Sequence, residues 1–326
     1  MSGRILVGSC SWADKTLIDS GWYPPSAKSA EERLRFYAEQ FPIVEVDSTY
    51  YAIPAQRTPE LWVERTPPEF TFDVKAYALF TGHAAAVQAF PKDLREALPP
   101  GLQAKRNVHM KDLPPSIGDE LWRRFDDVLL PIDSAGKLGT VLFQFPPWFG
   151  PNRGNREAIL EAKRRLGQYR MAVEFRNAGW MAEAADQERS LRFLADNEVP
   201  YVCVDEPQGF KSSVPPVTAV TSASAAILRL HGHNAATWTG KAATAAQRFD
   251  YLYDEDELKG WTPRIRQLAE DSREVHVLFN NCHRDYSVRN ARQIGEMLGV
   301  IAGRQATGNP IESAALADDG TQAPLL

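Results

Sequence analysis

Residues 170–180 read RMAVEFRNAGW, a short apolar run that ends in two opposite charges. The apolar positions 171–173 and 175 are typical of a buried β-strand. Because side chains alternate across a strand, we expect Glu174 and Arg176 on one face and Val173 and Phe175 on the other. A buried strand that ends in an acid and a base is a candidate functional site. The alternative is a salt-bridged strand end without chemistry, because structural ion pairs occur in the same places.

The whole chain has the composition of an ordinary soluble protein, with 326 residues of which 44% are hydrophobic and 24% charged. Its net charge of −5 argues against a protein that coats nucleic acid or acidic membranes through bulk electrostatics. The three cysteines, Cys10, Cys203 and Cys282, do not suit a disulfide framework, so we expect a reducing compartment, the cytoplasm. No apolar run approaches the roughly 20 residues of a membrane span.

Outward from residues 170–180, short β-rich runs alternate with longer helical ones. Further strands are expected at 5–8, 43–47, 70–75, 140–145, 201–205, 226–230 and 275–279. Helices are expected at 29–40, 59–65, 118–130, 156–166, 187–197, 258–271 and 287–301, with Pro263 near the first turn of the sixth. This alternation predicts an α/β fold, a single (β/α)₈ TIM-type barrel. A doubly wound open sheet is the alternative, but the chain lacks the glycine-rich phosphate-binding turns typical of that fold.

The predicted barrel has long loops after its third, sixth and seventh strands. The first of them, 76–117, is long enough to be an insertion that carries function or forms a lid. We place the barrel domain at residues 1–302. Residues 303–326 are polar and small, with Pro and Gly among them, and are expected to form a disordered C-terminal tail.

Polar side chains gather where the predicted strands end, which is the catalytic face of such a barrel. Three pairs lie two residues apart with apolar neighbours between them, so each pair is expected to face the interior. In chain order the strand ends supply Glu45, Asp47, Ser48 and Tyr51; Lys75; Gln144; Glu174 and Arg176; Asp205 and Glu206; Arg229 and His231; and Asn280 with Asn281. Buried unpaired charges are costly, so such a ring is expected to serve a ligand. The alternative is a buried network in which Lys75, Arg176 and Arg229 only neutralise the acids.

Eight short motifs surround these strand ends. They are GSCSW at 8–12, VEVDSTYY at 44–51, FDVKA at 72–76, LFQFPP at 142–147, VEFR at 173–176, VDEPQ at 204–208, RLHG at 229–232 and FNN at 279–281. The set resembles that of the YecE-like family, the domain of unknown function 72, over nearly the whole barrel. The resemblance implies a TIM-type barrel of unsettled activity, with motif positions at Trp12, Glu45, Ser48, Lys75, Gln144, Glu174, Arg176, Asp205, Arg229, His231 and Asn280.

The chain departs from the family pattern in two places. Asp47 stands where the family commonly has Asn, and Cys282-His283 stands where an acidic residue is common. A role that needs that acid is therefore in doubt for this chain.

The mixed charges favour an enzyme that acts on a small polar, phosphorylated or sugar-like compound, as an acid/base hydrolase or isomerase. Glu174 or Glu45 is the expected general base, and Lys75 or His231 the acid or electrostatic stabiliser. Asp205 completes the predicted catalytic set. The predicted substrate-binding residues are Arg176 and Arg229, which would clamp an anionic group, together with Trp12, Ser48, Tyr51, Gln144 and Asn280.

Four alternatives remain at this level. We predict no cofactor, although Glu45, Glu174, Asp205 and His231 are ligand types that a divalent metal takes. The alternative from another class is a protein that binds or processes nucleic acid or another phosphodiester. Two groups of basic residues suggest it: Lys105, Arg106, His109 and Lys111 in the insertion, and Arg153, Arg156, Lys163, Arg164, Arg165 and Arg170 around the helix 156–166. A solvated helix face explains the second group more simply. A non-catalytic ligand-binding barrel and a thiol mechanism at Cys282 or Cys10 complete the set.

Overall fold

A parallel sheet of eight strands forms the centre of the computed structural model, which describes residues 2–240 and 244–301. Its strands, in spatial order, are β7 (Met171–Glu174), β6 (Leu138–Gln144), β3 (Thr71–Lys75), β2 (Ile43–Val46), β1 (Arg4–Cys10), β10 (Glu274–Phe279), β9 (Ala226–Leu230) and β8 (Val202–Asp205). The two ends of this order meet at a bridge between Val173 and Tyr201. The amide of Val173 also donates to the Pro200 carbonyl at 2.9 Å. The predicted (β/α)₈ TIM-type barrel is thereby confirmed.

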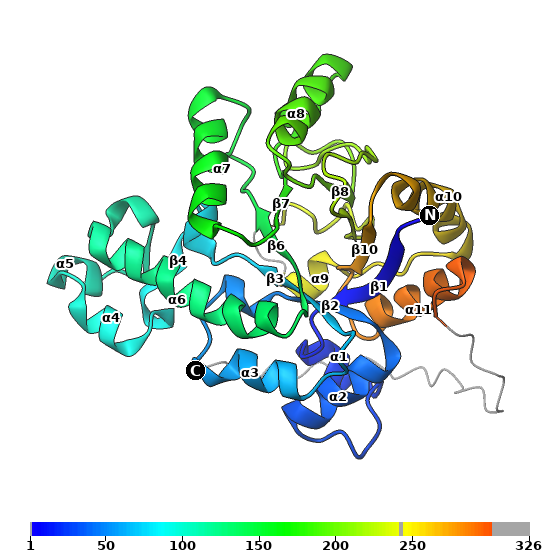
Figure 1. The fold of residues 1–326 in the computed structure, drawn as a ribbon, viewed down its shortest axis with the longest axis horizontal. Coiled ribbons are helices and arrows are strands. Elements are labelled where there is room, and N and C mark those ends of the chain that lie inside the picture. Colours follow the sequence, from blue (N-terminus) through cyan, green and yellow to red (C-terminus); the bar gives the residue numbers. More distant parts are fainter. Residues whose placement is uncertain (1, 241–243, 302–326) are drawn as a thin grey trace.

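Helices surround the strands on the outside of the barrel (Figure 1). They are α1 (Lys15–Asp19), α2 (Ala30–Gln40), α3 (Arg57–Glu64), α6 (Pro115–Ser134), α7 (Arg153–Leu166), α8 (Ala184–Asp196), α9 (Ala245–Arg248), α10 (Glu255–Asp271) and α11 (Tyr286–Leu298). Each long helix turns an apolar stripe to the sheet, as Leu121, Phe125 and Leu129 do in α6. None of the helices in the described residues is long and apolar enough to cross a membrane.

The long loops differ in kind. The insertion after β3 has structure of its own, with α4 (Lys92–Ala97), α5 (Pro100–Gln103) and an antiparallel pair of β4 (Ala85–Ala86) and β5 (Asn107–Val108), and α4 and α5 stand at one edge of the molecule beside α6 (Figure 1). Residues 206–225, which join β8 to β9, contain neither a helix nor a strand. The barrel therefore has one crossover without a helix. The predicted domain end at 302 and the predicted tail at 303–326 lie outside the described residues.

Helix α10 begins three residues earlier than the sequence pattern predicts. Asp254 caps it, and its carboxylate accepts from the Glu257 amide while the Glu257 carboxylate accepts from the Asp254 amide. This reciprocal cap satisfies two amides at the helix start. Pro263 consequently lies inside the helix rather than near its first turn.

Near the amino ends of the strands the barrel interior holds a buried ion pair. His276 Nδ1 lies 2.9 Å from Asp73 Oδ2, and both side chains are almost fully buried. The other oxygen, Asp73 Oδ1, accepts from the Thr140 amide at 2.7 Å. The neighbouring position must be glycine, because a Cβ on Gly139 would lie 2.3 Å from Asp73 Oδ1. The pair therefore ties β3 to β10 across the interior.

A second buried cation, Lys137, lies just before β6. Its Nζ donates to the carbonyls of Val63 and Thr66, both at 2.8 Å, and to the Thr66 hydroxyl at 3.0 Å. These carbonyls belong to the end of α3, where no intrahelical donor remains. Lys137 is thus a fully bonded structural lysine.

The buried pair predicts a pH-dependent loss of stability in Asp73→Asn. Burial alone would lower the pKa of His276, but Asp73 raises it to about 9. A histidine with a raised pKa contributes stability that is complete below its unfolded pKa of about 6.5 and is lost as the pH rises through about 9. We expect Asp73→Asn to lower the free energy of unfolding by about 3–5 kcal/mol at pH 6, and by less at pH 9.

Urea unfolding at several pH values measures this difference. The exposed Asp256→Asn is the control and should change the free energy of unfolding by about 0.5 kcal/mol at most. An equal cost of Asp73→Asn at pH 6 and pH 9 would contradict the assignment.

Candidate active site at the carboxyl ends of the strands

Strand register decides which side chains enter the upper part of the barrel. Cys10 pairs with Glu45 and Gln144 pairs with Glu174, and partners in a parallel ladder point to the same face. Arg229 pairs with Leu278 in the same way. Alternation therefore sends Glu45, Glu174 and Arg229 into the interior, as the sequence predicts, and each is at most 1% exposed.

Arg229 connects three strands at the centre of this site. Its Nη1 donates to Glu174 Oε2 at 2.5 Å and its Nη2 donates to Glu45 Oε1 at 2.8 Å. Nη2 also lies 3.5 Å from the sulfur of Cys10. The guanidinium thus links β9 to β7, β2 and β1. Both of its terminal nitrogens are engaged by these groups, and of its nitrogens only Nε has no partner among the described residues.

Arg176 makes a second set of contacts just above the first. Its Nε donates to Glu174 Oε1 at 2.5 Å and its Nη1 to Glu206 Oε2 at 2.6 Å. Gln144 Nε2 also donates to Glu174 Oε1, at 2.6 Å. The Trp238 ring covers the guanidinium at 5.2 Å. Like Arg229, Arg176 is held by protein carboxylates.

The His231 imidazole lies between Arg176 and Asn280. Arg176 Nη2 is 3.0 Å from Nε2, and the Asn280 amide is 2.8 Å from Nδ1. Burial, with Arg176 close by, lowers the pKa of His231 to about 3, so the ring is neutral near pH 7. The guanidinium that faces Nε2 only donates, and the Asn280 group that faces Nδ1 is the Nδ2 amide, so the neutral ring lies between two donor groups and accepts from one of them.

Three residues of the ring have charged or polar atoms that lack such partners. Among the described residues the Nζ of Lys75 makes no hydrogen bond and has no carboxylate oxygen within 4.0 Å. It lies over the face of the Tyr50 ring, 4.8 Å from the ring centroid. Glu45 Oε2 is buried and likewise has no partner in the described structure, and the same is true of Arg229 Nε. Polar atoms buried without partners are expensive, and Lys75 is partly exposed at the rim, so a ligand that enters there can make new bonds with these groups.

The carboxyl groups of the site are in contrasting states. Burial raises the pKa of Glu45 and of Asp47, although Arg229 and Lys75 oppose the effect. Burial also raises the pKa of Glu206, to about 7, against the pull of Arg176. Burial would raise the pKa of Glu174 as well, but Arg176 and Arg229 hold it well below its usual range. Glu174 is therefore the permanent anion of the site, while Glu45 and Glu206 are suited to carry protons.

Burial has the opposite effect on the pKa of Lys75, the basic side chain without an ion-pair partner in the described ring. It lowers this pKa, and the nearby Arg229 lowers it further, although Glu45 and Glu174 oppose the effect. A lysine with a lowered pKa and a carboxyl group with a raised pKa on neighbouring strands are the pattern of proton-transfer sites.

An aromatic arc borders the site on the side of the insertion. The rings of Trp148, His83, Tyr50 and Tyr51 follow one another with centroids 5.6, 5.3 and 5.1 Å apart. Burial and the nearby Lys75 lower the pKa of His83 to about 4, so its ring is neutral. Trp148 and Tyr51 are 67% and 63% exposed, more than any other large hydrophobic side chain described. These rings would contact whatever enters from above.

Asp205 is not part of the inner ring. Tyr201 pairs with Val173, whose side chain points out of the barrel, so the Tyr201 side chain points out as well. Because side chains alternate along β8, those of Cys203 and Asp205 point to the same outer face. The Asp205 carboxylate accepts from the Tyr253 hydroxyl at 2.8 Å and lies 3.0 Å from His233 Nε2. The acid that this strand end delivers to the ring is the next residue, Glu206. An alternating polar pattern would have revealed this, but residues 202–204 are apolar on both faces.

Three predicted binding residues also lie outside the ring. Trp12 is buried and packs edge-on against Trp62, with centroids 5.9 Å apart. Ser48 is exposed, and its side chain makes no hydrogen bond among the described residues. Tyr51 stands at the outer end of the aromatic arc rather than in the ring. The remaining predicted residues come together: Glu45, Lys75, Gln144, Glu174, Arg176, Arg229, His231 and Asn280.

The predicted set omits His83, Tyr50 and Trp238, although Tyr50 lies within the motif at residues 44–51. His83 lies in the insertion and Trp238 in the loop after β9, far along the chain from the strand ends they approach. Histidines and tryptophans in long loops have no periodic pattern that would place them.

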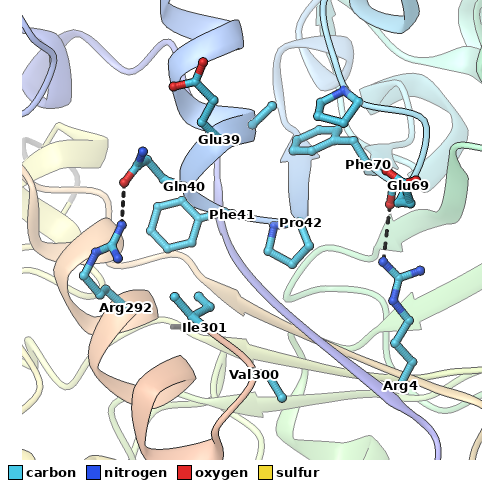
Figure 2. Close-up of a pocket in the computed structure, with 12 residues that line it drawn as sticks. Arg4, Glu39, Gln40, Phe41, Pro42, Glu69, Phe70, Arg292, Val300 and Ile301 are labelled. Atoms are coloured by element: carbon cyan, nitrogen blue, oxygen red, sulfur yellow. Dashed lines mark hydrogen bonds between the residues drawn. The ribbon is translucent and has the colours of Figure 1, made fainter. Parts of the chain in front are cut away.

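Two cavities help to delimit the site. One of about 350 Å³ opens at the rim, lined by Asp205, Glu206, Gln208 and His233. The other, of about 390 Å³, lies at the amino ends of the strands, between Phe41, Glu69 and Ile301 (Figure 2). Figure 2 shows both arginines of this cavity paired, Arg4 with the Glu69 carbonyl at 3.4 Å and Arg292 with Gln40 at 2.7 Å. Residues at this end of a barrel usually serve stability.

The four side chains named as possible ligands of a divalent metal, Glu45, Glu174, Asp205 and His231, do not converge in the described structure. Across residues 2–240 and 244–301, no three His, Cys, Asp or Glu side chains are placed to hold a metal ion. Both carboxylate oxygens of Glu174 instead accept hydrogen bonds, one from Arg176 and one from Arg229. The Asp205 carboxylate points out of the barrel, away from the other acids, and accepts from Tyr253.

The fold and the paired charges at the strand ends define a TIM-type barrel protein with a polar interior site. The chain belongs to the family of proteins of unknown function DUF72, whose model matches residues 6–313, so the family resemblance is confirmed. It is 33% identical over 300 residues to the UPF0759 protein YunF of Bacillus subtilis strain 168, a match that covers 91% of this chain and 95% of that protein.

Solved structures of the same family share the fold. A DUF72 family protein of Thermotoga maritima MSB8 is 29% identical, with a TM-score of 0.70 over 91% of this chain and 99% of that one. A DUF72 family protein of Enterococcus faecalis V583 is 24% identical, with a TM-score of 0.73 over 92% of this chain and 97% of that one.

The central position of Arg229 predicts that replacing it strongly destabilises the fold. We expect Arg229→Met to lower the free energy of unfolding by about 3–5 kcal/mol, because Glu174 and Glu45 would be left as buried acids without their shared cation. Arg153→Met is the matched control, since Arg153 pairs with Glu157 on the surface and its side chain is 93% exposed. The control should change the value by about 0.5 kcal/mol at most. Denaturant unfolding of both variants measures the difference, and comparable losses would contradict the assignment.

Proposed function

We propose that the chain is an enzyme that acts on a small polar substrate at the carboxyl rim of the barrel, with Lys75 and Glu45 as its proton-transfer pair. The observation that carries the proposal is the contrast within the ring. Most charged atoms there have a protein partner, whereas Lys75 Nζ, Glu45 Oε2 and Arg229 Nε have none among the described residues. Of these, only Lys75 has no polar partner for any atom of its charged group, and a network built only for stability would gain by pairing it.

The roles of the cations differ from those expected from the sequence. Arg176 and Arg229 orient Glu174 and Glu45 and set the electrostatic field of the site, because protein carboxylates occupy their donors. Lys75 is the cation left to meet the substrate. Glu45, whose pKa is raised by burial, supplies or removes the proton. This division supports an acid/base reaction, of the hydrolase or isomerase type, on a small polar or phosphorylated compound.

The contacts of α7 give less support to the nucleic-acid alternative. Arg153 pairs with Glu157, Arg164 with Glu161, and Arg165 with Asp119. Arg156 lies over the Trp180 ring at 5.7 Å. This helix face is therefore a set of local ion pairs on the outer wall, and such pairs leave few charges to neutralise phosphates.

The proposal predicts that Lys75→Met increases stability. A desolvated lysine without a partner destabilises the folded state, and removal of a group kept for function commonly adds about 0.5–2 kcal/mol. Because the pKa of Lys75 is lowered in the folded protein, the wild type should itself gain stability as the pH rises toward the unfolded lysine pKa of about 10.4. The gap between Lys75→Met and the wild type should therefore be largest near neutral pH and close above pH 10.

Urea unfolding at pH 7 and at pH 10 measures this gap. A loss of stability in Lys75→Met as large as that of Arg229→Met would show that Lys75 is a structural counter-charge, and the proposal would fail.

A ligand screen tests the site directly. Thermal unfolding of the wild type is measured against sugar phosphates, nucleotides and small carboxylates. A ligand at 100 times its dissociation constant adds about 2.7 kcal/mol of stability. We expect the shift produced by a stabilising compound to shrink in Lys75→Met and to persist in Lys92→Met, which removes an exposed lysine. An equal shift in both variants would place the ligand elsewhere.

A further inference from the structure

We propose that Lys75 is a nucleophile that forms an imine with an aldehyde or ketone substrate. The inference rests on the function proposed above and names the substrate class for the same site. It starts from the position of the amine, at the last residue of β3 and on the carboxyl rim where barrel strands present reacting groups.

The surroundings of Lys75 suit a nucleophile better than a counter-ion. The side chain is partly exposed, so a small molecule can reach it from the rim. No described carboxylate holds it, although Glu45 and Glu174 are near enough to act on its charge. The Tyr50 ring lies against the Nζ at 4.8 Å and limits its motion. An amine that must attack carbon needs its lone pair free, and hydrogen bonds or ion pairs would prevent this.

Lys137 shows what a structural lysine looks like in the same chain. Its Nζ donates three hydrogen bonds, to the carbonyls of Val63 and Thr66 and to the Thr66 hydroxyl. Burial lowers the pKa of Lys137 as it does that of Lys75. The two lysines differ in their partners, which are complete for Lys137 and absent for Lys75 in the described structure. The contrast in bonding, rather than in burial, assigns the nucleophile.

The neighbouring groups supply the rest of the step. The neutral amine of Lys75 attacks the carbonyl carbon, a C–N bond forms, and the proton that the nitrogen releases passes to the carbonyl oxygen, which gives a carbinolamine. Glu45 in its protonated form, with an unpartnered Oε2, then protonates the hydroxyl, and the C–O bond breaks as water leaves. The nitrogen lone pair forms the C=N bond, so one carbonyl, one neutral amine and one proton from Glu45 give one protonated imine, one water and the Glu45 carboxylate. The protonated imine can then accept the electron pair of a proton lost from the adjacent carbon.

Reductive trapping of the full chain tests the inference. The protein is incubated at pH 7 with propionaldehyde and sodium cyanoborohydride, which reduces the imine to a stable secondary amine. Peptide mass spectrometry then measures the rate of modification at each lysine. Each unit by which a lysine pKa falls raises its reactive neutral fraction about tenfold near neutral pH. We expect Lys75 to react at least about tenfold faster than Lys15 and Lys92, which are 86% and 80% exposed. Lys137 should remain unmodified.

A second variant separates the role of Glu45. The Glu45 charge favours the protonated form of Lys75, so Glu45→Gln would by itself make the amine more reactive. We expect trapping at Lys75 to slow at least about tenfold in Glu45→Gln, while Lys15 and Lys92 react as before. Modification of Lys75 no faster than that of Lys15 and Lys92 in the wild type would overturn the inference. That result would leave the proposed function standing if Lys75→Met still stabilises the protein and weakens ligand binding.

Discussion

The Arg229 guanidinium, held between Glu174 and Glu45 inside the barrel, is the interaction on which the rest of the site depends. Three charges on three strands are taken out of water together, and each removes much of the cost of burying the others. Because both acids are fixed by this cation, Glu174 can also orient Arg176, and Arg176 in turn reaches Glu206 and His231. The order of the upper barrel thus starts from one planar, permanently charged group.

The site combines two kinds of polar group that differ in what burial does to them. Glu174 and the two arginines compensate one another and stay charged. Lys75 and Glu45 lie beside them and lack some of the hydrogen bonds that they could make. Burial lowers the pKa of Lys75 and raises that of Glu45, and both shifts favour the neutral form of the side chain. A rigid charged frame with two adjustable groups at its edge is a general arrangement for acid/base chemistry, because the frame holds geometry while the adjustable groups exchange protons.

Strand alternation explains how much of this was predictable from the sequence. Glu45, Glu174 and Arg229 were placed inside because polar and apolar residues alternate around them. Alternation does not distinguish Asp205 from Glu206, because β8 is apolar on both faces and gives no indication of which face is inward, so the prediction of Asp205 followed the family motif. His83 and Trp238 come from long loops, whose course depends on tertiary packing. Which cations are paired and which are free follows from distances in three dimensions, and residue types along a chain do not contain that information.

The seam between β7 and β8 has a mechanical consequence. In the described residues these strands share the single bridge at Val173 and Tyr201, whereas β1 and β10 pair over six positions. No helix braces residues 206–225 on the far side of β8. Local opening of a fold begins where the fewest bonds must break, so we expect the barrel wall to open at this seam first. The ion pair between Arg176, just after β7, and Glu206, just after β8, joins the two strands at the carboxyl rim and therefore helps to hold the barrel closed.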